Sequence, residues 1–260
     1  MGEATRWEEI LGKQGISGKF QAEKKPSLAG IMGKAQEEKA SLIVVNLSSK
    51  EPGLSRRSVI KSLMRFTQVP FLLLPNTHFL PMQEATSEAP SPDGGIFNHV
   101  IFATNWSPFS QKCLDTLIHF KENITELEII TVIDKKLSIR DMIGLKDMLG
   151  ETRNLLKDRG IDAEGHVYAG KPSEEILLAV KDYGGSVIVM DASHRSALKT
   201  LLYGNCIHEV AEKADVPTLV IPQKRSQKSE ARSQESEVRS QPPSPAHRWW
   251  AGYGGPGNTE

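Results

Sequence analysis

The stretch GGSVIVMDASHRSALKTLLYGNCIHEVAEKADVPTLVIP, residues 184–222, decides the fold class of this chain. It reads as an apolar strand over 186–190, a polar loop closed by Gly204-Asn205, an amphipathic helix and a second apolar strand over 218–221. Continuous apolar strands are typical of parallel sheets whose two faces are covered by helices. In open sheets of this kind ligands bind outside the carboxyl ends of the strands, so the polar loop is the expected binding region.

The residues before this stretch continue the same alternation of strands and helices. Apolar runs predict strands at 99–103, 127–133 and 161–169. Amphipathic patterns predict helices at 107–118, 138–159 and 172–183. The order from 99 to 222 is therefore β-α-β-α-β-α-β-α-β, which predicts an α/β fold with a parallel sheet and right-handed crossovers.

Composition excludes several classes of protein. The 260 residues contain 32 Lys plus Arg against 32 Asp plus Glu, so charge gives no reason to expect a nucleic-acid partner. No segment reaches the ~20 apolar residues that a membrane-spanning helix needs, and the N-terminus lacks the apolar core of a signal peptide. Cys113 and Cys206 fit a reducing compartment, with Cys113 on the inner face of its helix. We therefore expect a cytoplasmic protein without membrane insertion, bound metal or disulfides.

The chain also contains an internal repeat. Lys25-Pro26-Ser27 matches Lys171-Pro172-Ser173, and two apolar strands, 41–45 and 69–75, match 186–190 and 216–222 at offsets of 145 to 147 residues. The first copy has no counterpart to residues 99–133, so it reads as truncated. We leave open whether the start lies upstream or whether the exposed edge of this half unit is covered by the second domain or by another chain.

Polar segments mark the boundaries of these units. MQEATSEAPSPDGG is rich in Pro, Ser, Glu and Gly and reads as a linker, and the C-terminal segment carries no periodic apolar face. We expect a partial, degenerate unit at 1–80, a linker at 81–97, a complete domain at 98–222 and a disordered tail at 223–260.

Three segments carry a family resemblance: VIFATNWSPFSQKCLDTL at 100–117, GKPSEEIL at 170–177 and the closing stretch at 184–222. Together they resemble a universal stress protein domain, and the first copy is similar to the back half of a second one. The resemblance implies a doubly wound five-stranded parallel sheet of the adenine-nucleotide α-hydrolase-like kind, with strand order 3-2-1-4-5. It also implies a homodimer, or a pseudo-dimer between the two copies, through the edge strand 218–221.

Nucleotide-binding members of this family carry Gly-x2-Gly-x9-Gly-Ser/Thr, whose glycines let backbone N–H groups approach phosphates. Here these positions hold Asp191, His194, Gly204 and Asn205. A carboxylate about 5 Å from a phosphate repels each unit charge by a few kcal/mol. The pocket that the resemblance implies is made of Ala103, Asn105, Ile133, Asp191, His194, Arg195, Gly204 and Asn205.

Two readings of function remain. The first is a non-enzymatic protein that acts in stress adaptation or regulates an unknown protein partner by association, with no cofactor. The second is a sensor that binds ATP or AMP, with Mg²⁺, in the second domain and hydrolyses ATP slowly at most. Ser193-His194 offers no triad, because adjacent side chains diverge and no third orienting group is identifiable, so we expect no catalytic residues.

Overall fold

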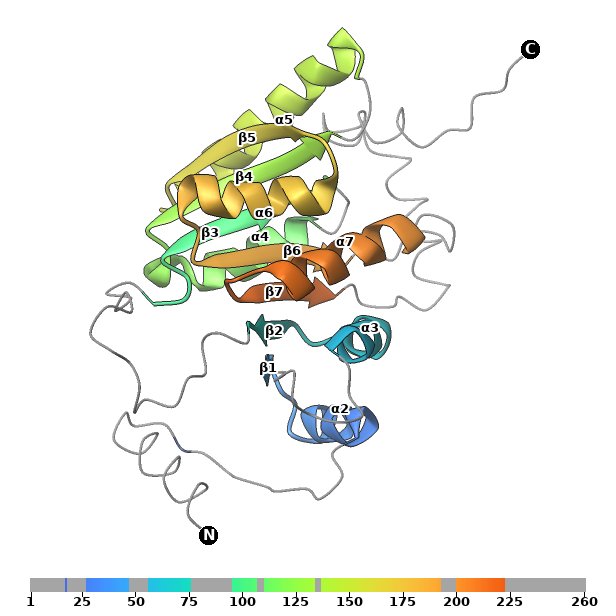
Figure 1. Cartoon of the computed structure of the whole chain (residues 1–260). Helices are drawn as coiled ribbons and strands as arrows, with labels where there is room; N and C mark the ends of the chain where they lie inside the picture. The colour runs from blue at the N-terminus through green and yellow to red at the C-terminus, as the bar shows by residue number, and fades with distance from the viewer. Residues whose placement is uncertain are drawn as a thin grey trace, which may run out of the picture. The chain divides into compact units, whose positions relative to one another are not determined.

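The computed structural model describes residues 17, 27–46, 56–75, 95–106, 110–133, 137–192 and 200–222. Its elements, in chain order, are α2 (Leu28–Glu37), β1 (Ile43–Asn46), α3 (Arg56–Phe66), β2 (Phe71–Leu74), β3 (His99–Ala103), α4 (Ser110–His119), the 3-10 turn η2 (Lys121–Asn123), β4 (Glu126–Ile133), α5 (Ile139–Asp158), β5 (Ala163–Ala169), α6 (Pro172–Tyr183), β6 (Val187–Ala192), α7 (Thr200–Lys213) and β7 (Thr218–Pro222) (Figure 1). None of the helices described is long and apolar enough to cross a bilayer.

The chain divides into two compact units, residues 1–39 and 40–260. The first contains α2, which begins where the Ser27 side chain accepts a hydrogen bond from the backbone N–H of Gly30 at 3.1 Å. This cap satisfies one of the helix's free amides, as expected for serine before an apolar periodic run. Every strand that the structure describes belongs to the second unit.

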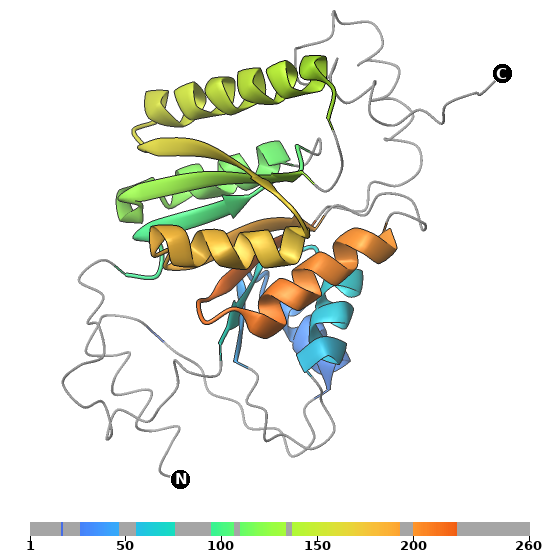
Figure 2. The same cartoon turned by 45° about the horizontal axis from the view of Figure 1, so that its top comes forward.

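The strands form one sheet in the order β1-β2-β7-β6-β3-β4-β5. Within it, the five strands between His99 and Pro222 run parallel to one another, and their order is the 3-2-1-4-5 arrangement predicted from the resemblance. In Figures 1 and 2 helices lie on both sides of this sheet, with α4 and α5 against one face and α6 and α7 against the other. The α/β class with a parallel sheet of this type is therefore confirmed.

The core follows from the continuous apolar runs of the central strands. Neighbouring residues point to opposite faces, so Val100 and Phe102 pack under α4 and α5, while Ile101 packs under α6. All three side chains are at most 1% exposed. Strand segments buried on both faces need apolar residues at successive positions, which is why residues 100–103 of β3 and 187–190 of β6 do not alternate.

The partial first copy does not form a sheet of its own. Its strands β1 and β2 are parallel to each other, and β2 pairs antiparallel with β7, in the register Phe71↔Val220 and Leu73↔Thr218. The apolar stripe of α3 is buried and this helix lies beside α7, as both views show (Figures 1 and 2). The edge of β2 is thus covered by the second copy within the same chain, and the sheet becomes mixed.

One local prediction is wrong. Gly204-Asn205 was expected to close the loop after β6, but α7 begins at Thr200, so both residues lie inside the helix. A glycine within a helix costs only about 1 kcal/mol relative to alanine, and the apolar residues that follow bury the helix against β6. Residues 193–199, which would form most of that loop, lie outside the described residues.

Candidate functional site

The candidate site lies at the carboxyl ends of β3, β4 and β6. Ala103, at the end of β3, is aligned with Ile130 on β4 and with Met190 on β6. The chain crosses from β3 to β4 on one side, while β6 lies on the other, so β3 marks the point where the winding direction changes. Ligands in open α/β sheets bind in the crevice at such a point.

Four predicted pocket residues have described side chains, and all come from this edge. Ala103 is buried, Asn105 is exposed just beyond it, and Ile133 and Asp191 are half-buried at the ends of β4 and β6. Ala103 is level with Ile130, so Ile133 lies three residues, or about 10 Å, further along β4, beyond the end of β3. These four residues therefore share the carboxyl edge of the sheet, where the resemblance implied a pocket.

For the other four predicted positions the structure describes at most the backbone. His194 and Arg195 lie outside the described residues. Gly204 and Asn205 are described by their backbone, which is helical, and not by their side chains. In a helix their amides are engaged along the helix axis, except in its first turn, so these positions differ from the extended glycine loop expected for a phosphate cradle.

Asp191 places a carboxylate in the crevice on the β6 side. Burial raises the pKa of the Cys113 thiol, on α4, well above its ordinary value, and the charge of Asp191 raises it further. The carboxylate of Asp191 is thus close enough to α4 to act on a fully buried group there. A ligand in the crevice meets this charge, which disfavours polyphosphates.

Trp106 is a residue of this edge that sequence reasoning missed. Its backbone has φ +57°, a left-handed conformation that is rare for a bulky side chain, and its N–H donates to Thr104 Oγ1 at 3.0 Å. The indole Nε1 is buried, and the described part of the chain offers it no hydrogen-bond acceptor. A buried N–H without a partner is costly, so this donor is a specific chemical feature of the site. The sequence did not predict this buried indole N–H, because tryptophan in a turn is usually a packing residue.

A polar contact ties α6 to α7 beside the same edge. The Lys171 ammonium lies 2.7 Å from Glu209 Oε2 and 3.2 Å from Glu174 Oε1, and Ser173 Oγ donates to Glu209. The contact raises the pKa of Lys171 and lowers that of Glu209. Burial raises the pKa of the neighbouring Cys206 thiol to about 12, with the charge of Glu209 adding to the effect. A raised pKa disfavours the thiolate form that a nucleophilic cysteine needs.

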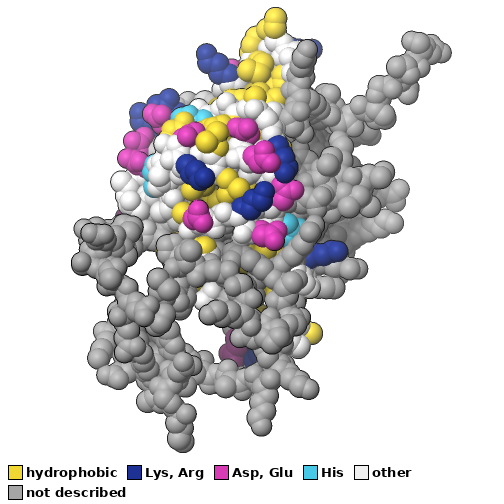
Figure 3. Space-filling model, in the orientation of Figure 1, with side chains coloured by type: hydrophobic (Ala, Val, Ile, Leu, Met, Phe, Trp, Pro, Cys, Tyr) yellow, Lys and Arg dark blue, Asp and Glu magenta, His cyan; other side chains and the backbone are white. Residues whose placement is uncertain are grey.

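An apolar groove lies along the outermost strand of the sheet, between α5 and β5. It has a volume of about 520 Å³ and is lined by Leu137, Ile139, Met142, Ile143, Leu145, Lys146, Leu149, Gly165 and Val167. Several of these side chains are exposed, most of all Ile139 at 82% and Ile143 at 57%. Hydrophobic side chains also gather at the upper end of the face drawn in Figure 3.

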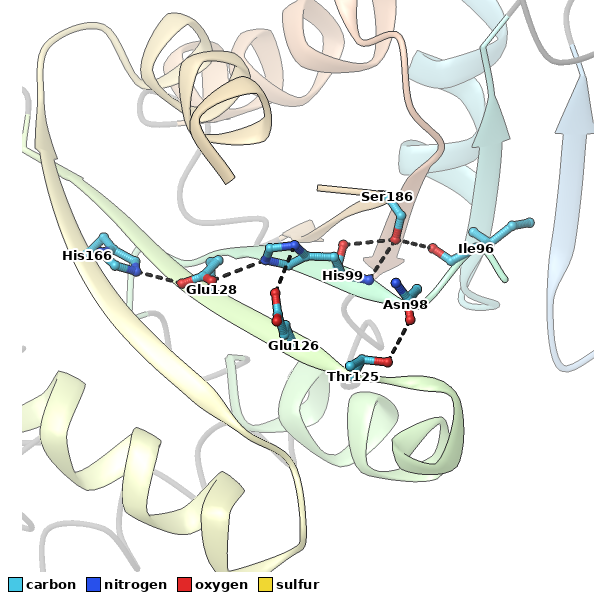
Figure 4. A network of polar contacts seen from close by, with 8 residues as sticks. All are labelled: Ile96, Asn98, His99, Thr125, Glu126, Glu128, His166 and Ser186. Carbon is cyan, nitrogen blue, oxygen red and sulfur yellow. Dashed lines mark hydrogen bonds and ion pairs between the residues drawn. The ribbon is translucent and has the colours of Figure 1, made fainter. Parts of the chain in front are cut away.

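A second polar cluster occupies the amino ends of the strands, on the face covered by α6 (Figure 4). Glu128 on β4 lies between two imidazoles, with His99 Nε2 at 3.1 Å from one carboxylate oxygen and His166 Nε2 at 2.6 Å from the other. Sequence reasoning missed this cluster, which comes from three different strands. The available signal was polar residues at alternate positions of β4 and β5.

Comparisons with known proteins agree with this fold. The model of the universal stress protein family matches residues 97–222. The universal stress protein YxiE of Bacillus subtilis is 28% identical over 147 residues, which cover 48% of this chain and 99% of that protein. The stress response protein NhaX of the same organism is 24% identical over 76 residues, covering 29% of this chain and 46% of that protein.

A solved structure extends the likeness to the first copy. The crystal structure of a universal stress protein from Archaeoglobus fulgidus superposes with a TM-score of 0.58 at 18% identity, over 86% of this chain and 78% of that chain. At this identity the likeness concerns the fold. The family match and the strand order together place the domain at residues 97–222 in the universal stress protein family.

Proposed function

We propose that this protein acts without enzymatic chemistry, as a module of stress adaptation that regulates a protein partner by binding it in the groove between α5 and β5. The observation that carries the proposal is the exposure of neighbouring aliphatic side chains along this groove. Ile139, Met142 and Ile143 lie within the first five residues of α5 and are 82%, 44% and 57% exposed, and Val167 on β5 is 41% exposed. Contiguous exposed apolar surface is disfavoured unless a partner covers it.

The chemistry of the groove defines the partner segment. Lys146 is the charged residue among its lining side chains. We therefore expect an amphipathic helix whose apolar face packs along the first half of α5 and whose acidic residue pairs with Lys146. Among the described strands, β5 is at the edge of the sheet and pairs on one side only, with β4.

Site-directed substitution tests this assignment. Ile143→Asp introduces a charge into the groove, and Leu178→Asp introduces the same charge at a side chain on α6 that is exposed to 45%. A photo-crosslinking residue at position 139 identifies the bound protein in cells, and calorimetry with the purified partner measures affinity. Ile143→Asp should abolish binding while Leu178→Asp leaves it unchanged. Equal affinity of both variants for the partner would refute the groove as the binding site. Crosslinking of position 139 to a second copy of this chain would instead show that the groove is a self-association surface.

The second candidate function is an adenine-nucleotide sensor that uses the carboxyl-edge crevice. The buried Trp106 Nε1 favours it, because a base or ribose oxygen could accept its hydrogen bond and Asn105 is exposed beside it. Asp191 and the substituted glycines disfavour phosphates, so AMP fits this edge better than ATP. Calorimetry with AMP, and with ATP and Mg²⁺, decides: stoichiometric micromolar binding would establish the sensor and overturn the cofactor-free proposal.

We also propose that the β2–β7 junction is a pseudo-dimer interface between the two copies. The antiparallel register of β2 and β7 supports it, since β2 and β7 are the final strands of the two repeats. With β7 paired on both sides, its edge is not available to a homodimer. Analytical ultracentrifugation should therefore show no dimer that forms through β7. We also propose a cytoplasmic location, which the free thiols at Cys113 and Cys206 fit.

A further inference from the structure

The polar cluster on the α6 face combines acidic and imidazole side chains from three adjacent strands. In the parallel register His99 lies beside Glu126, and Glu128 lies beside Glu164, with His166 two residues further along β5. Side chains two apart on a strand share a face, so all five project from the same side of the sheet. This cluster is at the amino ends of the strands, at the opposite end of the sheet from the crevice.

The cluster places a buried carboxylate directly beside a second carboxylate. Glu128 is only 8% exposed, and it lies directly across from Glu164 on the neighbouring strand. Like charges in directly opposed positions destabilise a sheet. In the described part of the chain, the ion-pair partners of Glu126 and Glu128 are imidazoles, and neither lysine nor arginine pairs with any of the three glutamates.

The donor atoms are close enough to share an ion. One ligand atom from each of Glu128, Glu164 and His166 lies within 4.8 Å of the other two. In a tetrahedral zinc site with bonds of about 2.0–2.1 Å, ligand atoms are about 3.3 Å apart, so small side-chain rotations bring the three together. An imidazole with two carboxylates suits Zn²⁺ better than Mg²⁺, which prefers oxygen ligands and several waters.

The surroundings orient these side chains as in known metal sites. The second ring nitrogen of His166, Nδ1, lies 3.0 Å from the Tyr183 hydroxyl, and the two rings are in contact with centroids 4.5 Å apart. Metal-bound histidines nearly always engage their other nitrogen in this way. Tyr183 is the last residue of α6, whose carboxyl-terminal dipole end attracts cations.

We propose that His166, Glu128 and Glu164 form a binding site for one Zn²⁺ ion, with a water as the fourth ligand. His166 binds through Nε2 and keeps its contact with Tyr183 through Nδ1. Glu128 binds through the oxygen that now faces His166, while its other oxygen keeps the hydrogen bond from His99 (Figure 4). The ion removes the repulsion between the opposed carboxylates and fastens the edge strand β5 to β4 and to the end of α6.

Zinc binding by the full-length, tag-free chain after EDTA treatment tests the site. Calorimetry with ZnCl2 should show one ion per chain with micromolar or tighter affinity, and zinc should raise the Tm where MgCl2 at the same concentration does not. His166→Gln and Glu164→Gln should each weaken binding at least tenfold. The matched control is His119→Gln on α4, an exposed histidine whose Nδ1 lies 2.6 Å from the Asp115 carbonyl oxygen of its own helix, and it should leave zinc binding unchanged.

Comparing the Tm of the variants with and without zinc distinguishes a zinc site from a polar network that only stabilises the fold. Glu164 is exposed, so Glu164→Gln should fold, and without zinc it should have a higher Tm than the wild type because one of two opposed charges is gone. With zinc the order should reverse. The site is overturned if the wild type shows no saturable zinc binding, or if Glu164→Gln and His166→Gln bind zinc as the wild type does.

Discussion

Replacing Phe71 by alanine tests whether β2 belongs to the same cooperative fold as β7. Phe71 is fully buried and pairs with Ile43 on one side and Val220 on the other. A phenylalanine side chain buries about 150–250 Å², worth about 4–6 kcal/mol at ~25 cal/mol per Å². Phe→Ala changes in cores cost about 3–5 kcal/mol, because a methyl group remains and the site partly collapses. We expect this loss in the free energy of unfolding.

Urea unfolding followed by circular dichroism measures the loss, and hydrogen exchange shows where it falls. If β2 and β7 unfold together, Phe71→Ala should lower the urea midpoint of the single main transition and speed amide exchange in β7. Val44→Ala is the control, because Val44 on β1 is 55% exposed and should change stability by less than about 0.5 kcal/mol. A loss below ~1 kcal/mol for Phe71→Ala, with β7 exchange unchanged, would refute the shared core.

Three further predictions concern the complete domain. Gly185→Ala should destabilise by about 1–3 kcal/mol in urea unfolding, because Gly185 is buried and an added Cβ would overlap an isoleucine of β3. Cys113 and Cys206 should resist a thiol reagent at mildly alkaline pH and react only after unfolding, because burial raises the pKa of both; rapid native labelling of Cys113 would contradict this. Glu209→Gln should flatten the acid limb of the stability–pH curve. The pKa of Glu209 is lowered by Lys171, so its contribution is present above the unfolded carboxyl pKa and is lost as pH falls through the folded value; salt should weaken the effect.

Local signals predicted the elements of the complete domain well. The strands β6 and β7 are apolar runs bounded by polar residues, and α6 begins at Pro172 and ends before Gly184, which has the left-handed φ of +65° that glycine supplies at a helix end. These signals depend on a few neighbouring residues, so they can be read without the fold. The strand order came from the family resemblance, since periodicity does not say which strands are neighbours.

Contacts between distant segments could not be predicted in this way. Backbone N–H and C=O groups are the same at every strand edge, so nothing local showed that Leu73 would pair with Thr218. The start of α7 at Thr200 was missed because Gly204 was weighed as part of a glycine motif, although the helix tolerates it. The first two glycines of that motif are replaced here by Asp191 and His194.

The candidate sites differ in how visible they were. Ala103, Asn105 and Asp191 follow apolar strands, so their common sheet edge could be predicted from topology. The cluster around Glu128 required the register of three strands, because a one-residue shift would turn its side chains to the other face. Polar residues at alternate positions of β4 and β5 were the only local sign of it.

The pairing of β2 with β7 also has a consequence for synthesis of the chain. Phe71 and its partner Val220 are separated by 220 − 71 = 149 positions in the chain. At about 5–20 residues per second, a ribosome needs roughly 7–30 s to reach Val220 after adding Phe71. During that interval β2 has no strand to pair with on this side, and an unpaired apolar strand invites intermolecular association. We therefore expect chaperones to bind the first copy of the repeat during synthesis, until the last strand of the sheet emerges.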